Sequence, residues 1–243
     1  TVAIGSHSVT PLEIATGYAV FANGGYKVEP YLIERIVNFN DGEVYRAQPP
    51  TVCQTCDTQA EVDAQIANNQ IPEFDPVTPA LRVIDERTAY IMNSILRSVI
   101  TEGSGRPVSR AFNRSDLAGK TGTTNDNFDL WFSGFNRDLV TTVYVGYDQP
   151  DGLGRAEQAA TVAIPVWLNF MKPVLEGRPE SFMPQPDGLV TVRINRDTGL
   201  RAGPNEEGAI FEIFREEEVP SYGTNPAQAD PSQQGTDTFD PLF

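Results

Sequence analysis

A run of eight residues near the middle of the chain combines a lysine, glycines and small hydroxyl side chains: Gly119-Lys120-Thr121-Gly122-Thr123-Thr124-Asn125-Asp126. A Gly-Lys-Thr core occurs in P-loops, where backbone N–H groups cradle phosphates. A P-loop also needs a glycine five residues before the Gly-Lys pair and a helix directly after it. That earlier position is Arg114, and Gly122 to Asn125 would begin a helix poorly. The segment therefore does not favour a nucleotide site.

The same core occurs in the Lys-Thr-Gly motif of serine enzymes that recognise penicillin, where it lies on a strand beside the active site. Residues 117–123 favour a strand. Lysine offers a point charge for a carboxylate, and glycine lets a substrate backbone approach because it has no Cβ. Alternation along the strand predicts two faces, one with Lys120, Gly122 and Thr124, the other with Thr121 and Thr123. A surface lysine followed by a bend in the sheet is the simpler alternative for the motif alone.

The segments that accompany the motif distinguish between these two interpretations. The accompanying segments are Val9-Thr10-Pro11-Leu12-Glu13, Tyr18-Ala19-Val20-Phe21-Ala22-Asn23-Gly24-Gly25, Asp116-Leu117-Ala118-Gly119, Trp131-Phe132-Ser133-Gly134-Phe135, Val143-Tyr144-Val145-Gly146-Tyr147-Asp148 and Ile164-Pro165-Val166-Trp167. As a set they resemble bifunctional class A penicillin-binding proteins of the 1A type. The resemblance runs from Thr1 to about Pro186.

The resemblance implies acyl transfer, in which a serine attacks a D-Ala-D-Ala amide and hydrogen-bond donors stabilise the charge on oxygen. It implies that Lys120 positions the carboxylate of the peptide or of a β-lactam and hydrogen-bonds the serine of a second motif. The hydroxyls of Thr121 and Thr123 would bind that carboxylate, and the Thr123 N–H would be one of two oxyanion-hole donors. The expected catalytic residues are thus Lys120 and Thr123, and the expected substrate-binding residues are Thr121, Gly122, Thr123 and Thr124. No cofactor is expected.

The sequence departs from the family pattern at the nucleophile, which the family carries in a Ser-x-x-Lys motif. The residues three positions before the three lysines, Lys27, Lys120 and Lys172, are Gly24, Leu117 and Asn169. No serine stands in the Ser-x-Asn triplet of the second motif either. We therefore expect the isolated chain to be inactive and the serine to belong to a missing N-terminal part of the same enzyme.

Two helices are predicted before the motif. Thr10 and Glu13 form a capping box for the first, and the Asn-Gly-Gly run at 23–25 ends it. Asp85 caps the second, which runs to about Ile100. Its expected buried stripe is Thr88, Ile91, Met92, Ile95, Leu96 and Val99.

Three strands at 117–123, 131–135 and 139–147 are joined by short connections, which predicts antiparallel neighbours. Residues 159–175 are apolar nearly all round and predict a helix packed on that sheet. The fold class is therefore α+β, an antiparallel sheet with packed helices, resembling an incomplete penicillin-binding transpeptidase or serine β-lactamase. A small β-rich appendage follows it.

Three regions are expected. Residues 1–185 form the C-terminal part of a transpeptidase domain, with 48–79 as an insertion or long loop. Residues 186–220 form a small β-rich extension with strands at 189–194 and 209–214. Residues 221–243 form an acidic tail of disorder-like composition.

The formal net charge of -15 and the pI of about 4.4 argue against nucleic-acid partners, because an acidic surface repels phosphates. No apolar run is long enough to span a membrane. Cys53 and Cys56 form one C-x-x-C pair, and the only histidine is His7, so a structural zinc site is not expected. The pair predicts a disulfide in an oxidising compartment, with two free thiols as the alternative.

The function predicted from the resemblance is peptidoglycan cross-linking by a serine transpeptidase, with stem peptides and β-lactams as ligands and a glycosyltransferase as partner domain. A carboxypeptidase or β-lactamase of the same superfamily is one alternative. A non-catalytic structural or interaction fragment is the other. The chain has neither an initiating Met nor a signal peptide, so we expect a fragment of a longer protein. The resemblance implies a periplasmic location, with attachment to the inner membrane through sequence absent here.

Overall fold

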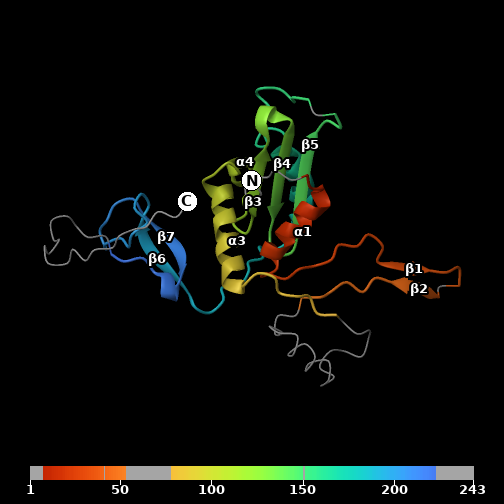
Figure 1. The fold of residues 1–243 in the computed structure, drawn as a ribbon, viewed down its shortest axis with the longest axis horizontal. Coiled ribbons are helices and arrows are strands. Elements are labelled where there is room, and N and C mark those ends of the chain that lie inside the picture. The colour runs from red at the N-terminus through yellow and green to blue at the C-terminus, as the bar shows by residue number, and fades with distance from the viewer. Residues whose placement is uncertain (1–7, 41, 53–77, 150, 223–243) are drawn as a thin grey trace, which may run out of the picture. The chain divides into compact units, whose positions relative to one another are not determined.

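The computed structural model describes residues 8–40, 42–52, 78–149 and 151–222. The chain divides into two compact units, Thr1–Asp187 and Gly188–Phe243. The first unit contains a three-stranded sheet with helices on both of its faces (Figure 1). This architecture confirms the α+β class expected from the sequence.

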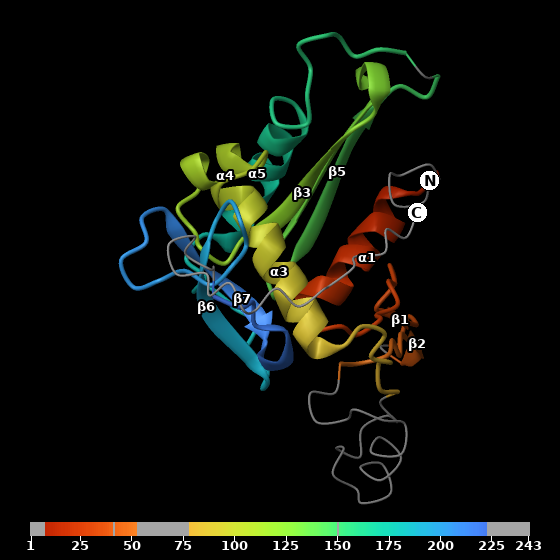
Figure 2. The same ribbon diagram turned by 60° about the vertical axis from the view of Figure 1, so that its left-hand side comes forward.

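The central sheet consists of β3 (Ala118–Thr123), β4 (Asp129–Phe135) and β5 (Val140–Gly146). Their order is β3-β4-β5, and both pairings are antiparallel. The three strands predicted from the sequence are thus confirmed. Helices α1 and α3 pack on one face of this sheet, and α5 packs on the other (Figure 2).

Helix α1 (Pro11–Ala22) begins at the predicted capping box. Thr10 Oγ1 accepts a hydrogen bond from the Glu13 N–H at 3.2 Å, and Glu13 Oε2 accepts one from the Thr10 N–H at 2.7 Å. The helix ends at Asn23, where two glycines with positive φ reverse the chain. One of them, Gly25, is buried and has a φ of +103°. A Cβ at Gly25 would lie 2.0 Å from the carbonyl oxygen of Ile84.

Helix α3 (Glu86–Thr101) begins at Asp85, whose side chain accepts a hydrogen bond from the Thr88 N–H, as predicted. Its buried face differs from the expected stripe, since the buried residues are Ala89, Leu96 and Ile100. Thr88 is exposed, and the Ile95 side chain is 51% exposed. The buried face shares Leu96 with the predicted stripe but is otherwise offset from it, since it includes Ala89 and Ile100.

Helix α5 (Ala163–Leu175) starts later than predicted, because residues 159–162 form turns. It buries one face rather than its whole circumference. The residues of that face are Ala163, Ile164, Trp167, Met171 and Leu175. They form the main hydrophobic core with Leu117, Phe132 of β4, Ile100 of α3 and Val108 of the short helix α4 (Arg106–Ala111).

The strands β1 (Arg35–Val37) and β2 (Glu43–Arg46) pair antiparallel, and all of their residues are exposed. The apolar run at 31–37 is typical of a strand in the sequence, but within the described residues only Arg35–Val37 pair with β2, so the strand is shorter than that run predicts. Of the predicted insertion at 48–79, residues 53–77 lie outside the described residues, as do Cys53, Cys56 and His7.

The second unit contains an antiparallel pair, β6 (Leu189–Asn195) and β7 (Ala209–Arg215), which confirms the two strands predicted there. A short 3₁₀ turn, Glu216–Glu218, follows β7. Residues after 222 lie outside the described part, so the predicted acidic tail stays a prediction.

We predict that Gly25→Ala lowers the melting temperature by at least about 4 °C. Positive φ alone costs an alanine about 1–2 kcal/mol, and the added Cβ would also clash with the Ile84 carbonyl. The matched control is Gly17→Ala inside α1, where nothing lies within 4 Å of the added Cβ. That variant should be stabilised by about 0.5–1 kcal/mol. Equal melting temperatures for the two variants would contradict the assignment of Gly25 as a conformational requirement.

Candidate functional site

The Lys-Thr-Gly segment lies on β3, an edge strand of the central sheet. Within the described residues, β3 pairs with β4 on one side only. Its burial falls along its length: Ala118 and Gly119 are buried, whereas Lys120 and Thr123 are exposed. Lys120 Nζ donates a hydrogen bond to the Thr121 carbonyl oxygen at 2.8 Å. The ammonium group therefore lies at the rim of the sheet, accessible to solvent.

The strand register separates the motif into two faces, as predicted. Lys120 pairs with Ser133 and Gly122 with Trp131, whereas Thr121 pairs with Phe132. Paired residues of antiparallel strands share a face. Ala118, two residues before Lys120, belongs to the cluster under α1 and α3, so Lys120 and Gly122 share that face. Phe132 packs edge-on against Trp167 of α5, so Thr121 and Thr123 share the opposite face.

The neighbour of Gly122 on β4 leaves little room for a side chain at this position. A Cβ at this position would lie 3.2 Å from Trp131 Cβ, and the Trp131 ring packs against Tyr144, with centroids 4.6 Å apart. Trp131 Cβ is next to the backbone and cannot rotate away. The sequence had suggested close approach of a substrate as the reason for this glycine, and packing within the sheet is a second reason.

Thr124 lies just after β3 and holds the turn that follows. Its Oγ1 accepts a hydrogen bond from the Asp129 N–H at 2.9 Å. The turn contains the 3₁₀ segment Asn125–Asn127, in which Asp126 and Asn127 both have positive φ. Asn127 Nδ2 donates to the Gly154 carbonyl oxygen at 3.0 Å, which ties the turn to the segment after β5. Substrate contacts of Thr124 stay a prediction.

Among the described residues of the first unit, Lys120 lines neither of two cavities. One has about 40 Å³ and is lined by Arg97, Asp116 and Ser181, among others. The other has about 190 Å³, with Asn23, Arg82 and Pro184 in its wall. The active site that the motif implies beside Lys120 stays a prediction. In the described part of the chain, no group of acidic, His or Cys side chains could hold a metal, and no helix has the length and apolarity to cross a membrane.

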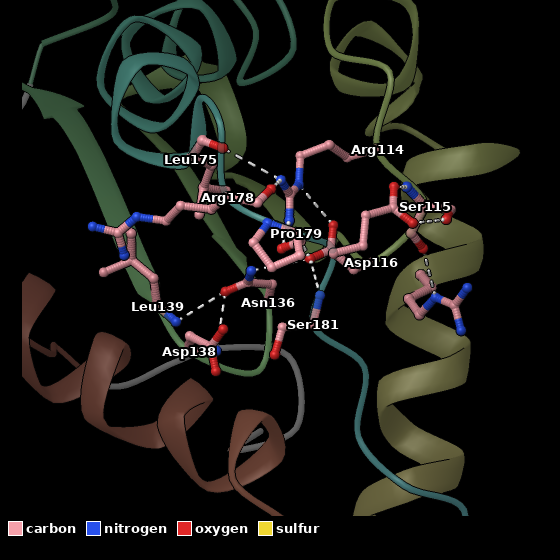
Figure 3. A network of polar contacts seen from close by, with 12 residues as sticks. Arg114, Ser115, Asp116, Asn136, Asp138, Leu139, Leu175, Arg178, Pro179 and Ser181 are labelled. Atoms are coloured by element: carbon pink, nitrogen blue, oxygen red, sulfur yellow. Dashed lines mark hydrogen bonds and ion pairs between the residues drawn. The ribbon is translucent and has the colours of Figure 1, made fainter.

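A buried ion pair stands directly before β3 (Figure 3). The guanidinium of Arg114 donates to Asp116 twice, from Nε to Oδ1 at 2.9 Å and from Nη2 to Oδ2 at 2.7 Å. The side chains are 7% and 0% exposed. Asp116 Oδ2 also accepts hydrogen bonds from Asn136 Nδ2 and from the Ser181 N–H, both at 3.0 Å. Arg114 donates further to the carbonyl oxygens of Arg178 and Pro179.

This network connects three parts of the unit that are distant in sequence: the start of β3, the β4–β5 turn and the segment after α5. Asn136 caps the β4–β5 turn, since its Oδ1 accepts from the N–H groups of Asp138 and Leu139. Ser115 donates to Glu180 from both its N–H and its hydroxyl, at 2.7 and 2.6 Å. Sequence reasoning missed the network. An Arg-x-Asp triplet directly before a strand was the available signal.

The pKa of Asp116 is lowered from its ordinary value. Burial alone would raise this pKa, but hydrogen bonds from Arg114, the Ser181 N–H and Asn136, together with the Arg114 charge, outweigh it. The hydrogen bond with Asp116 also raises the pKa of Arg114. Both groups are thus held in their charged forms.

Another contact missed from the sequence lies at the motif itself. Ser104, in the turn between α3 and α4, places its Oγ 2.6 Å from Thr121 Oγ1. In the sequence, the glycines on both sides of Ser104 indicate only the end of the preceding helix.

An antiparallel sheet with helices on both faces and a Lys-Thr-Gly motif on its edge strand describes a penicillin-recognising fold. The family model "Penicillin binding protein transpeptidase domain" matches residues 1–171, and the chain belongs to this family. Among curated relatives, Penicillin-binding protein 1A of Pseudomonas aeruginosa is 46% identical over 90% of this chain. Penicillin-binding protein 1A of Neisseria gonorrhoeae is 39% identical over 79% of it.

A solved structure of Penicillin-Binding Protein 1A from Haemophilus influenzae has a TM-score of 0.78 and 34% identity over 92% of this chain. The chain spans 34% of that protein and 29% and 21% of the two curated relatives. The resemblance to class A penicillin-binding proteins of the 1A type is thereby confirmed, and the chain corresponds to less than half of the length of these relatives.

We predict that Asp116→Asn destabilises the protein by about 3–5 kcal/mol at neutral pH, because it leaves the buried Arg114 charge without its counter-ion. Since the folded-state pKa of Asp116 lies below its unfolded value of about 3.9, the carboxylate stabilises the fold fully above that pH. The contribution is lost as pH falls through the folded-state pKa. The stability difference between wild type and variant should therefore be constant from about pH 5 upward and shrink below about pH 4.

Urea unfolding at a series of pH values measures this difference. Asp148→Asn is the control, because Asp148 is exposed on the surface and its loss should change stability by less than about 0.5 kcal/mol. A stability difference for Asp116→Asn that grows as pH falls would contradict the assigned direction of the pKa.

Proposed function

We propose that this chain is the part of a peptidoglycan transpeptidase that binds the substrate carboxylate and the developing oxyanion. The observation that carries the proposal is the Lys120-Thr121-Gly122-Thr123 segment on an exposed sheet edge, with the Lys120 ammonium accessible to solvent. The ligands are D-Ala-D-Ala stem peptides and β-lactams, both of which present a carboxylate beside an acyl group.

The edge strand explains how the residues would act together. Alternate N–H and C=O groups of β3 point away from β4 and can pair with an extended peptide backbone. Lys120 supplies the positive charge for the carboxylate, and the hydroxyls of Thr121 and Thr123 donate hydrogen bonds to it. The Thr123 N–H would stabilise the oxyanion of the tetrahedral intermediate. Gly122 keeps the strand free of a side chain at the point of closest approach.

The nucleophile must come from outside this chain, because no serine here stands in a Ser-x-x-Lys or Ser-x-Asn motif. In the proposed mechanism a serine from another part of the full-length protein attacks the carbonyl carbon, and the terminal D-Ala leaves as the amine. The acyl-enzyme is then resolved by the amine of a second stem peptide. A periplasmic location, a membrane anchor elsewhere in the protein and a glycosyltransferase partner domain belong to the same proposal.

A carboxypeptidase or a β-lactamase of the same superfamily would use the same residues with water as the acceptor. The match of a transpeptidase model over residues 1–171, and relatives named Penicillin-binding protein 1A, support the transpeptidase. The absence of the nucleophile motifs makes a purely structural role the remaining alternative for the isolated chain.

We predict that Lys120→Ala in the full-length protein slows acylation by a labelled penicillin at least about a hundredfold, because the positive charge that positions the carboxylate is lost. The second-order acylation rate constant, measured by gel fluorescence, tests this. Lys172→Ala is the matched control, since Lys172 is exposed on α5 and should leave the rate unchanged. An acylation rate that survives Lys120→Ala would remove the proposed role of this residue.

We also predict that the isolated 243-residue chain forms no covalent adduct with excess penicillin, because carboxylate-binding and oxyanion groups provide no atom that can attack the carbonyl. Intact-mass spectrometry of the isolated chain and of the full-length protein compares the two directly. The full-length protein should gain the mass of one penicillin. A stoichiometric adduct on the isolated chain would show that the wrong motif has been assigned to the chemistry.

A further inference from the structure

The hydroxyl of Thr121 has a neighbour that the Lys-Thr-Gly motif does not include. Ser104 Oγ lies 2.6 Å from Thr121 Oγ1, and either atom can be the donor. Ser104 belongs to the turn between α3 and α4, whereas Thr121 belongs to β3. The contact therefore joins a helix terminus to the edge strand at the residue whose hydroxyl is expected to meet the substrate carboxylate.

The turn that carries Ser104 is held in one conformation. The N–H groups of Glu102, Gly103 and Gly105 donate to carbonyl oxygens of Ser98 or Val99 at 2.8–3.1 Å. A Cβ on Gly103 or on Gly105 would lie 3.0 Å from the Val99 carbonyl oxygen. The backbone on both sides of Ser104 therefore packs closely against the end of α3.

Both ends of the contact rest on the main core. Ile100 and Val108, which flank the turn, are 1% and 0% exposed. Thr121 pairs across β3–β4 with Phe132, which is fully buried and packs against Trp167. The two hydroxyls are thus placed by rigid elements rather than by mobile side chains on a loop.

The chemistry of the ligand sets the direction of this hydrogen bond. A carboxylate only accepts hydrogen bonds, so Thr121 can bind it only if its proton is not already given to Ser104. Ser104 must then be the donor and Thr121 the acceptor, which leaves the Thr121 proton free to point at the carboxylate. A hydroxyl that accepts one hydrogen bond donates a stronger one.

We propose that Ser104 is a positioning residue for the site: it donates a hydrogen bond to Thr121 Oγ1 and so directs the Thr121 hydroxyl proton toward the substrate carboxylate. This inference rests on the proposed function and deepens it, since it adds a residue outside the motif that determines selectivity for a carboxylate.

The test is made in the full-length protein with two probes, a labelled penicillin and its neutral methyl ester. Ser104→Ala should lower the acylation rate constant for the penicillin about three- to tenfold, the value of one hydrogen bond, and leave the rate for the ester unchanged. Ser104→Thr keeps the hydroxyl and should restore the wild-type ratio of the two rates. Ser98→Ala, whose hydroxyl bonds only within α3, is the matched control and should leave both rates unchanged.

A double-mutant cycle separates positioning from general support of the fold. Thr121→Val removes the hydroxyl through which Ser104 is proposed to act, so adding Ser104→Ala to it should change the penicillin rate by less than about twofold. Equal loss on both probes, or additive effects in the cycle, would assign Ser104 a structural role only and overturn the inference. A full-length wild-type protein that forms no penicillin adduct would overturn the proposed function as well.

Discussion

The buried ion pair between Arg114 and Asp116 is the constraint on which the rest of the first unit depends. Removing two charges from water carries a penalty of several kcal/mol per ion, which only close geometry and further hydrogen bonds can offset. Both are present, since the pair is bidentate and each partner makes additional hydrogen bonds. The pair therefore tolerates only one arrangement of its surroundings, and the start of β3, the β4–β5 turn and the segment after α5 must meet there.

Close packing continues from this ion pair along β3 toward the motif. Leu117 and Ala118 are buried directly after Asp116, and Gly119 lies so close to β4 that a Cβ would be 2.7 Å from the Ser133 carbonyl oxygen. The strand reaches Lys120 with its register already determined, and there it becomes exposed. A strand with a buried, packed start and an exposed end suits a binding site, because the residues that contact a ligand must be held in place by packed neighbours.

Much of this fold could be predicted from the sequence where the causes are local. The helix starts at Thr10 and Asp85 follow from capping side chains within three residues, and the strands follow from alternation. The exposure of Ile95 beside the buried Leu96 could not be predicted, because it depends on distant residues: Leu96 clusters with Ala118 and Phe135 of the sheet. The candidate site was likewise predictable only where its causes are local. The motif is contiguous and recognisable, whereas the contact between Ser104 and Thr121 and the bond from Asn136 to Asp116 span 17 and 20 residues.

The close packing of Gly122 against Trp131 bears on how such a site can evolve. A Cβ added at Gly122 would lie 3.2 Å from the Cβ of Trp131. Replacing Trp131 would not remove this contact, because every residue other than glycine has a Cβ. A single substitution at Gly122 therefore has no easy accommodation on β4. We expect adaptive change around this strand to proceed through neighbouring positions that have room for a side chain, while this glycine is retained.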